Sequence, residues 1–217
     1  MGDRSRPLIV AMKGHPGTGK STLARGAAAA LRLPLLDKDD VRDCTLPLQQ
    51  SPSPSPSPSQ SQSQSQTLGG GGGVGAASLN ELSYAVLWRV AETQLRLGLS
   101  VVVDSPLSRA THLAALRRAA ARCGGARIAI VECRPGRELE WRRRLEERGA
   151  AAASGGGGEG WHKPRTWGEL RSLVEAYEGR AEYEVGDDVA RLVVDTTEEG
   201  VAADEMVARV VDFIRSL

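Results

Sequence analysis

One short segment limits what this chain can fold into. Residues 14–21 read Gly-His-Pro-Gly-Thr-Gly-Lys-Ser, the complete G-x-x-x-x-G-K-[ST] pattern of a phosphate-binding loop. The apolar run Leu8–Met12 precedes this loop, and the alanine-rich, helix-prone run Thr22–Leu31 follows it. A buried parallel strand, a glycine-rich loop and a helix are the arrangement that the pattern requires. The sequence therefore predicts an α/β fold that binds the phosphates of a nucleotide.

Each residue type in this loop has a physical task. Glycines let the backbone adopt positive φ and approach a phosphate closely, so that successive N–H groups converge on the β-phosphate at the positive end of a helix. Lys20 is placed to bridge the β- and γ-phosphates, and Ser21 to offer its hydroxyl to a magnesium ion. We expect the nucleotide to contact the whole loop: Gly14, His15, Pro16, Gly17, Thr18, Gly19, Lys20 and Ser21.

Composition excludes several classes of protein. The formal net charge of +1 over 217 residues provides no global field that would recruit nucleic acid or an anionic membrane. The three cysteines include no C-x-x-C pair, so neither a disulfide framework nor a zinc site is indicated. No apolar run reaches membrane-spanning length, and the first strand begins too near the start for a signal peptide. We expect a cytoplasmic protein without a membrane partner.

Two segments differ in composition from the rest of residues 1–217, which we expect to form a single domain. Residues 47–77 alternate Ser-Pro and Ser-Gln and then run into glycines, which predicts a disordered insertion because little apolar surface is available to offset chain entropy. Residues 149–166 contain an Ala/Gly stretch between charged helices. This second segment is interpreted as a lid loop, or alternatively as a loop of variable length.

We expect that residues 51–73 can be deleted with the fold intact. Their composition cannot support a core, and closure entropy changes only weakly with loop length. Thermal melting of the deletion protein measures this directly. A large fall in melting temperature would show that the segment packs against the domain.

The remaining chain alternates apolar runs with helix-prone stretches. Strands are expected at 33–37, 99–104, 126–132 and 190–195, and helices at 79–97, 109–122, 137–148, 167–177 and 201–214. Such alternation predicts a parallel sheet covered on both faces, with ligands beyond the carboxyl ends of the strands. Asp39, Asp104 and the phosphate loop all follow strands and therefore belong to that edge.

Asp104 follows three valines and can hold magnesium or orient Ser21; the simpler interpretation is a cap or turn residue before Ser105-Pro106. No glutamate follows Asp104, which disfavours a hydrolytic motor. Asn80 is the only asparagine in the chain, so a guanine-reading N-K-x-D motif is impossible and ATP is the expected nucleotide.

Two further groups can serve phosphoryl transfer. Asp39 can accept the proton of an attacking hydroxyl, and Arg42 can hold an anionic group of the acceptor, although Asp39 or Asp40 can equally cap the next helix. Arg144 and Arg148 lie four residues apart, on one helical face, and can neutralise charge in the transition state. The simpler interpretation of that face is a solvated one, paired with neighbouring glutamates.

Together these segments resemble the small P-loop kinases of the AAA-domain or zeta-toxin-like kind, which include polynucleotide 5′-kinase and chloramphenicol phosphotransferase. Stretches such as Val103–Ser108 and His162-Lys163-Pro164 resemble most closely a plant group of P-loop NTPase-superfamily proteins. The resemblance implies a three-layer P-loop NTPase sandwich whose five parallel strands run in the order 2-3-1-4-5, with a helical lid. It also implies magnesium-ATP as the donor.

In the polynucleotide kinases an R-D-D-Y-R segment supplies the base and an acceptor contact, which by resemblance fall on Asp39 and Arg42, and the lid arginines fall on Arg144 and Arg148. Val41 replaces the aromatic residue of that segment, and the low-complexity insertion follows closely, so the acceptor itself does not transfer. The sequence thus predicts a kinase for a hydroxyl of a small metabolite or of a nucleic-acid 5′ end. The alternative is a nucleotide-binding regulatory module or a slow ATPase.

Overall fold

Five parallel strands form one sheet in the order β2-β3-β1-β4-β5, the predicted order. The structure, a computed structural model, describes residues 6–50, 75–154, 160, 162–177, 179 and 181–217. The strands are β1 (Leu8–Lys13), β2 (Leu35–Asp37), β3 (Val101–Asp104), β4 (Arg127–Arg134) and β5 (Ala190–Asp195). Every neighbouring pair is parallel, as expected when helices connect successive strands.

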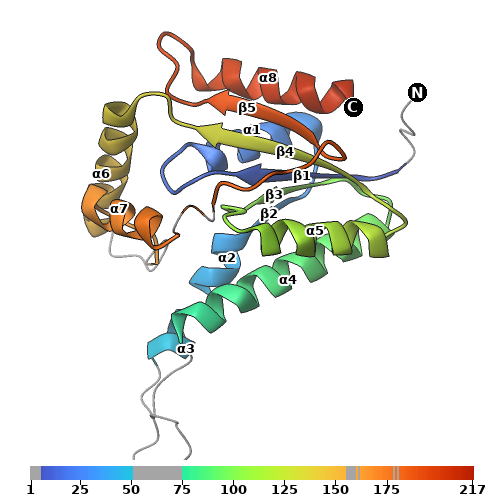
Figure 1. Ribbon diagram of the computed structural model, residues 1–217, viewed down its shortest axis with the longest axis horizontal. Helices are drawn as coiled ribbons and strands as arrows, with labels where there is room; N and C mark the ends of the chain where they lie inside the picture. Colours follow the sequence, from blue (N-terminus) through green and yellow to red (C-terminus); the bar gives the residue numbers. More distant parts are fainter. Residues whose placement is uncertain (1–5, 51–74, 155–159, 161, 178, 180) are drawn as a thin grey trace, which may run out of the picture.

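Helices cover both faces of this sheet, which completes the three-layer sandwich (Figure 1). One face carries α1 (Lys20–Leu31) and α8 (Ala203–Ser216), and the other carries α4 (Ala76–Arg96) and α5 (Ala110–Arg122). The shorter α2 (Lys38–Asp43) and α3 (Leu46–Gln50) connect β2 toward α4. Beyond the carboxyl ends of β4 and β5 lie α6 (Glu138–Ser154) and α7 (Trp167–Ala176).

The central strand β1 separates two hydrophobic cores. All six of its residues are buried; the first five form a continuous apolar run, and the sixth, Lys13, pairs with Glu132 of β4. Val10 and Met12 belong to the core beneath α1 and α8, whereas Ile9 and Ala11 belong to the core beneath α4 and α5. Successive side chains of a strand point to opposite faces, so one strand supplies both cores and fixes the position of the loop that follows it.

Several element boundaries differ from the sequence expectation: β2 begins only at Leu35, β4 continues to Arg134, and α8 covers Ala203–Ser216. Helix α6 continues to Ser154 instead of ending at Arg148, because the alanines at 150–153 are strong helix formers. At the insertion, α3 occupies Leu46–Gln50 and α4 begins at Ala76. The remaining residues of the insertion, 51–74, lie outside the described residues, as do residues 155–159 of the expected lid loop.

The start of β3 also lies later than expected, at Val101. Gly98 has a φ of 80°, and the N–H of Leu99 donates a hydrogen bond to the carbonyl of Gln94. This is the left-handed turn with which a helix commonly ends. Leu99 therefore belongs to the end of α4 although it is apolar.

Candidate active site

The phosphate loop joins β1 to α1 and depends on its glycines. Gly17 and Gly19 have φ of 79° and 80°, a region that residues with side chains rarely adopt. Gly14 has a φ of 141°, and a Cβ at this position would lie 2.5 Å from the carbonyl oxygen of Cys133 in β4. A side chain at Gly14 would therefore displace the loop from the sheet edge.

Lys20 is the first residue of α1 and is buried inside the loop. Its Nζ donates a hydrogen bond to the carbonyl of His15 at 2.6 Å. Burial lowers the pKa of Lys20, and the negative charge of Asp104 partly opposes this effect. An ammonium group held in the loop with little solvation is well placed to bind a phosphate anion.

Asp104 ends β3, the strand beside β1, and its side chain is buried. Its Oδ2 has no hydrogen-bond partner among the described residues, and burial raises the pKa of Asp104 while Lys20 and the Ser21 hydroxyl oppose the rise. The described part of the chain contains no group of three His, Cys, Asp or Glu that could hold a metal. Ser21 and Asp104 nevertheless fit magnesium, which binds one or two protein oxygens and completes its shell with phosphates and water.

Asp37 is the residue that caps α2. Its Oδ1 accepts a hydrogen bond from the N–H of Asp39 at 2.9 Å, the geometry of an N-cap. The sequence left open whether Asp39 or Asp40 performs this task, and neither does. The carboxylate of Asp39 is consequently available for another role.

The cap also makes stability depend on pH. Burial and the nearby charge of Asp104 raise the pKa of Asp37 from 3.8 to about 6. Between these two values the folded protein binds more protons than the unfolded chain, so stability falls as pH rises through that window. Asparagine caps helices about as well as aspartate. We therefore expect Asp37→Asn to melt at a higher temperature than the wild type above about pH 6 and to match it near pH 4.

Melting curves of both proteins across this pH range, without nucleotide or magnesium, measure the effect. Asp40→Asn is the control, because Asp40 is exposed and does not cap the helix. Parallel pH profiles for Asp37→Asn and the wild type would contradict the interpretation.

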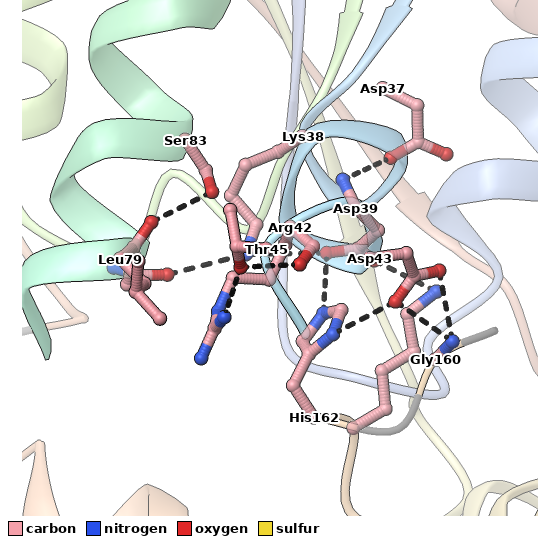
Figure 2. A network of polar contacts seen from close by, with 12 residues as sticks. Asp37, Lys38, Asp39, Arg42, Asp43, Thr45, Leu79, Ser83, Gly160 and His162 are labelled. Carbon is pink, nitrogen blue, oxygen red and sulfur yellow. Dashed lines mark hydrogen bonds and ion pairs between the residues drawn. The ribbon is translucent and has the colours of Figure 1, made fainter. Parts of the chain in front are cut away.

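Two lysines and a histidine surround Asp39. Nε2 of His162 lies 3.0 Å from Oδ1, Nζ of Lys38 lies 3.2 Å from Oδ1, and Nζ of Lys163 lies 2.8 Å from Oδ2. Figure 2 shows the imidazole between Asp39 and Asp43, whose Oδ1 lies 3.2 Å from Nδ1 of His162. Burial opposes ionisation of Asp39, but the hydrogen bond from His162 and the two lysine charges outweigh it and hold the pKa of Asp39 well below its usual range.

The side chain of Arg42 contacts Thr45 and Gln49. Its guanidinium is buried and donates to Oγ1 of Thr45 at 2.5 Å and to Oε1 of Gln49 at 2.9 Å. These contacts attach α2 to Thr45 and to α3; Figure 2 shows the contact with Thr45. Arg42 is not among the residues that line the cavity described below. Its acceptor contact therefore stays a prediction, and the geometry provides no support for it.

Helix α6 packs directly on the phosphate loop. Trp141 Nε1 donates a hydrogen bond to the carbonyl of Pro16 at 2.9 Å, and the rings of Trp141 and Tyr177 flank His15, each with a centroid separation of 6.1 Å. Arg144 is oriented by Glu140 and by the carbonyl of Thr196, each at 2.7 Å. This packing explains why the helix that carries the arginines lies over the loop.

Arg148 donates a hydrogen bond to the carbonyl of Pro164 at 2.9 Å, one turn of α6 beyond Arg144. Burial lowers the pKa of Arg148, while the charge of Asp39 opposes this effect. At Gly149, a Cβ would lie 2.1 Å from the carbonyl oxygen of Arg165. The glycine therefore allows the close approach of the segment that carries Lys163.

One cavity of about 680 Å³ brings most of these groups together. The predicted site residues that line it are Pro16, Gly17, Gly19, Lys20, Ser21, Asp39, Asp104, Arg144 and Arg148. Gly14, His15 and Thr18 belong to the same loop but shape it from behind: Thr18 donates a hydrogen bond to the carbonyl of His15 at 2.8 Å. Three regions that were predicted separately thus face a single space: the phosphate loop, the segment after β2 and the helix α6.

Several lining residues carry no motif and were missed in the sequence. Lys38 of α2, Tyr84 of α4, Ser105 of the connection between β3 and α5, and His112 of α5 line the cavity. Ser105 Oγ and both ring nitrogens of His112 are buried without a hydrogen-bond partner among the described residues. A buried polar group without a partner costs about 1–3 kcal/mol. The residues beside Ser105 and His112 in the sequence form no motif that would indicate a place in the lining of this cavity.

Comparison with known proteins now defines the family. The model of the AAA domain matches residues 9–156, which is more than half of the chain. The chain belongs to the AAA-domain family. Among curated proteins, no sequence matches it. The expected closer likeness to a plant group stays a prediction.

Several solved structures with the same fold are kinases or were solved with a bound nucleotide. A Chloroflexus aurantiacus protein with a provisional kinase name is 20% identical, with 99% of each chain covered and a TM-score of 0.65. Mycobacterium tuberculosis APS kinase CysC, solved with AMPPNP and APS, is 19% identical over 97% of this chain and 98% of its own, with a TM-score of 0.58. Chaetomium thermophilum Kti12, solved with ADP-AlF3, is 18% identical over 97% and 98%, with a TM-score of 0.56.

These likenesses establish the fold of a kinase-like, nucleotide-binding P-loop NTPase. In the part of the chain that the structure describes, no helix combines the length and apolarity needed to cross a membrane.

Proposed function

We propose that this protein is a kinase that transfers the γ-phosphate of magnesium-ATP to a hydroxyl group. One observation carries the proposal: Asp37 caps α2, so that the carboxylate of Asp39 is free of that task and faces the cavity that contains the phosphate loop. A protein that only binds nucleotide does not need an ionised carboxylate in this place. A kinase needs one to accept the proton of the acceptor.

The cavity provides a surface for each part of the donor. Lys20 and the loop glycines lie at the phosphate end, and Arg144 and Arg148 approach the same space from α6. Val201 and Met206, from the connection after β5 and from α8, form an apolar wall that suits an adenine ring. Ser21 and Asp104 would hold the magnesium ion, which when bound neutralises phosphate charge.

The transfer step then uses groups of this chain in named roles. The acceptor oxygen forms a bond to the γ-phosphorus as the bond from that phosphorus to the β–γ bridging oxygen breaks, and the acceptor's proton passes to Asp39 while ADP leaves. Lys20, Arg144 and Arg148 stabilise charge on the phosphoryl oxygens. The low pKa of Asp39 keeps its carboxylate ionised, and a loose transition state requires positioning of the acceptor more than strong basicity.

A regulatory module or slow ATPase is the second candidate, and one observation favours it. Both oxygens of Asp39 contact the segment at His162 and Lys163, so this carboxylate could serve only to attach that segment to α2. ATP labelled at the γ-phosphate, incubated with pooled hydroxyl metabolites and 5′-hydroxyl oligonucleotides, separates the two. Label in an acceptor supports the kinase. Release of free phosphate alone indicates a slow ATPase, and neither product indicates a regulatory module.

A further inference from the structure

The side of the cavity formed by α4, by α5 and by the connection between β3 and α5 has a distinct chemistry. Ser105 is 2% exposed and His112 is 5% exposed, and both line the cavity together with Tyr84. Nε2 of His112 lies 3.9 Å from Oε1 of Glu81, too far for a hydrogen bond. Ser105 Oγ and the ring nitrogens of His112 have no hydrogen-bond partner of good geometry among the described residues. Ser105 lies near enough to Tyr84, and His112 to Glu81, for the neighbour to affect the pKa of Tyr84 and of His112 respectively. Because both groups are shielded from bulk water, they would bind a ligand group with little competition from solvent.

The hydrogen-bonding capacity of Ser105 and His112 determines which ligand groups they can bind. Burial lowers the pKa of His112, so that its ring is neutral and offers one donor and one acceptor. A serine hydroxyl also both donates and accepts. A phosphate or carboxylate can only accept and would leave the acceptor nitrogen of His112 unsatisfied. A hydroxyl group donates and accepts and therefore complements both side chains.

The charged side chains around Ser105 and His112 are paired with residues of opposite charge. Lys38 pairs with Asp39 at 3.2 Å, and Arg109 lies 3.7 Å from Glu81. An anionic ligand would meet two cations that already face carboxylates. The balance favours an uncharged ligand on this side of the cavity.

The surface is also held rigidly, as recognition of a small ligand requires. The imidazole of His112 stacks on Tyr84 with a centroid separation of 3.8 Å. Leu107 has a φ of 44°, which is strained for a residue with a side chain, and its carbonyl accepts a hydrogen bond from Tyr183 Oη at 2.6 Å. The carbonyl of Pro106 accepts a hydrogen bond from the N–H of Gly14 at 3.1 Å.

We propose that Ser105 and His112 form the acceptor subsite and that the acceptor is a small, neutral polyol or sugar, a conclusion that rests on the kinase function proposed above. The hydroxyl that receives phosphate would point toward Asp39, and neighbouring hydroxyls would bind Ser105 and His112. Ser105 and His112 line the same cavity as the phosphate loop, so ATP and the acceptor would share one space.

A polynucleotide end fits the surroundings less well. The adjoining cavity, of about 490 Å³, is lined by cationic side chains, but Asp37, Asp39, Asp40 and Asp43 line it as well. A phosphate backbone requires a row of cations that lack acidic partners. The acidic residues here would repel it.

Binding to the full-length protein saturated with magnesium and AMPPNP tests the subsite without relying on catalysis. Saturation-transfer NMR measures the affinity of D-ribose, D-glucose, D-mannitol and myo-inositol. A 5′-hydroxyl oligothymidylate is measured in the same way and represents the alternative acceptor, a polynucleotide end. We expect at least one polyol to bind the wild type. Ser105→Ala and His112→Phe should each weaken it by roughly three- to tenfold, the effect of one neutral hydrogen bond. The phenylalanine retains the stacking on Tyr84.

Ser83→Ala is the matched control, because Ser83 is a buried serine of α4 whose hydroxyl donates to the carbonyl of Leu79 and does not line the cavity. AMPPNP affinity should be unchanged in all three variants. The inference would be overturned if none of the four polyols binds the wild type, or if the oligonucleotide binds and the polyols do not. It would also be overturned if Ser105→Ala and His112→Phe bind the polyol as tightly as the wild type. Polyol binding that depends on Ser105 and His112, without transfer of label from ATP, would uphold the subsite while refuting the kinase function.

Discussion

Lys20→Ala will bind ATP roughly 10- to 100-fold more weakly than the wild type, because a charge-assisted contact contributes about 1.5–3 kcal/mol. The ammonium group is buried inside the phosphate loop, where it donates a hydrogen bond to the carbonyl of His15. Burial lowers the pKa of Lys20, so the charge is not well solvated in the absence of nucleotide. The substitution should therefore remove ligand affinity without destabilising the empty protein.

Isothermal titration calorimetry with magnesium-ATP measures the affinity, and melting with and without ATP provides the control. The wild type should gain melting temperature on adding ATP, because a ligand that binds only the folded state stabilises it. The variant should melt without ATP at or above the wild-type temperature and gain little from the nucleotide. A folded Lys20→Ala protein with wild-type affinity would refute the assignment of the loop.

Asp39→Asn will retain its fold and its affinity for magnesium-ATP but lose about 10²–10⁴-fold in transfer rate, because a neutral amide cannot take the acceptor's proton. The helix cap does not depend on this side chain, since the cap is Asp37. Lys20 and Ser21 begin α1 whereas Asp39 belongs to α2, so nucleotide binding should change little. The substitution thus separates chemistry from binding.

The measurement is single-turnover transfer of labelled phosphate to the acceptor, with Asp40→Asn as the matched control. Asp40 is the next residue of α2 but does not line the main cavity. Loss of transfer in Asp40→Asn but not in Asp39→Asn would show that the wrong carboxylate was chosen. Wild-type transfer in both would contradict the kinase mechanism.

The sheet and its order are the part of this molecule that is most readily predicted from sequence. The phosphate-loop pattern between Leu8–Met12 and Thr22–Leu31 determines β1, the loop and α1, and the run at residues 190–195 coincides with β5 because turn-forming aspartates and threonines flank it. The predicted ends of helices and strands are wrong where the local composition suits more than one kind of structure. The alanines at 150–153 suit both a helix and a small-residue loop, and packing decides in favour of α6.

The site is less predictable, because its members come from separate elements. Any of the three aspartates between residues 37 and 40 could cap α2, and only the point where β2 ends selects Asp37. Ser105 and His112 belong to no motif, and only the tertiary structure shows that their polar atoms share a cavity with Asp39. Arg42 demonstrates the converse, since a residue placed by resemblance at the acceptor is engaged with Thr45 and Gln49.

The hydrogen bond from Gly14 to Pro106 has a thermodynamic consequence. It joins the loop that receives ATP to the loop that carries Ser105, so a change in one loop alters the energy of the other. If occupancy of the nucleotide loop changes acceptor affinity by some factor, the acceptor must change nucleotide affinity by the same factor. Titrations of each ligand at several concentrations of the other would therefore form a closed cycle, and the size of this shared factor would report how tightly Pro106 couples the two loops.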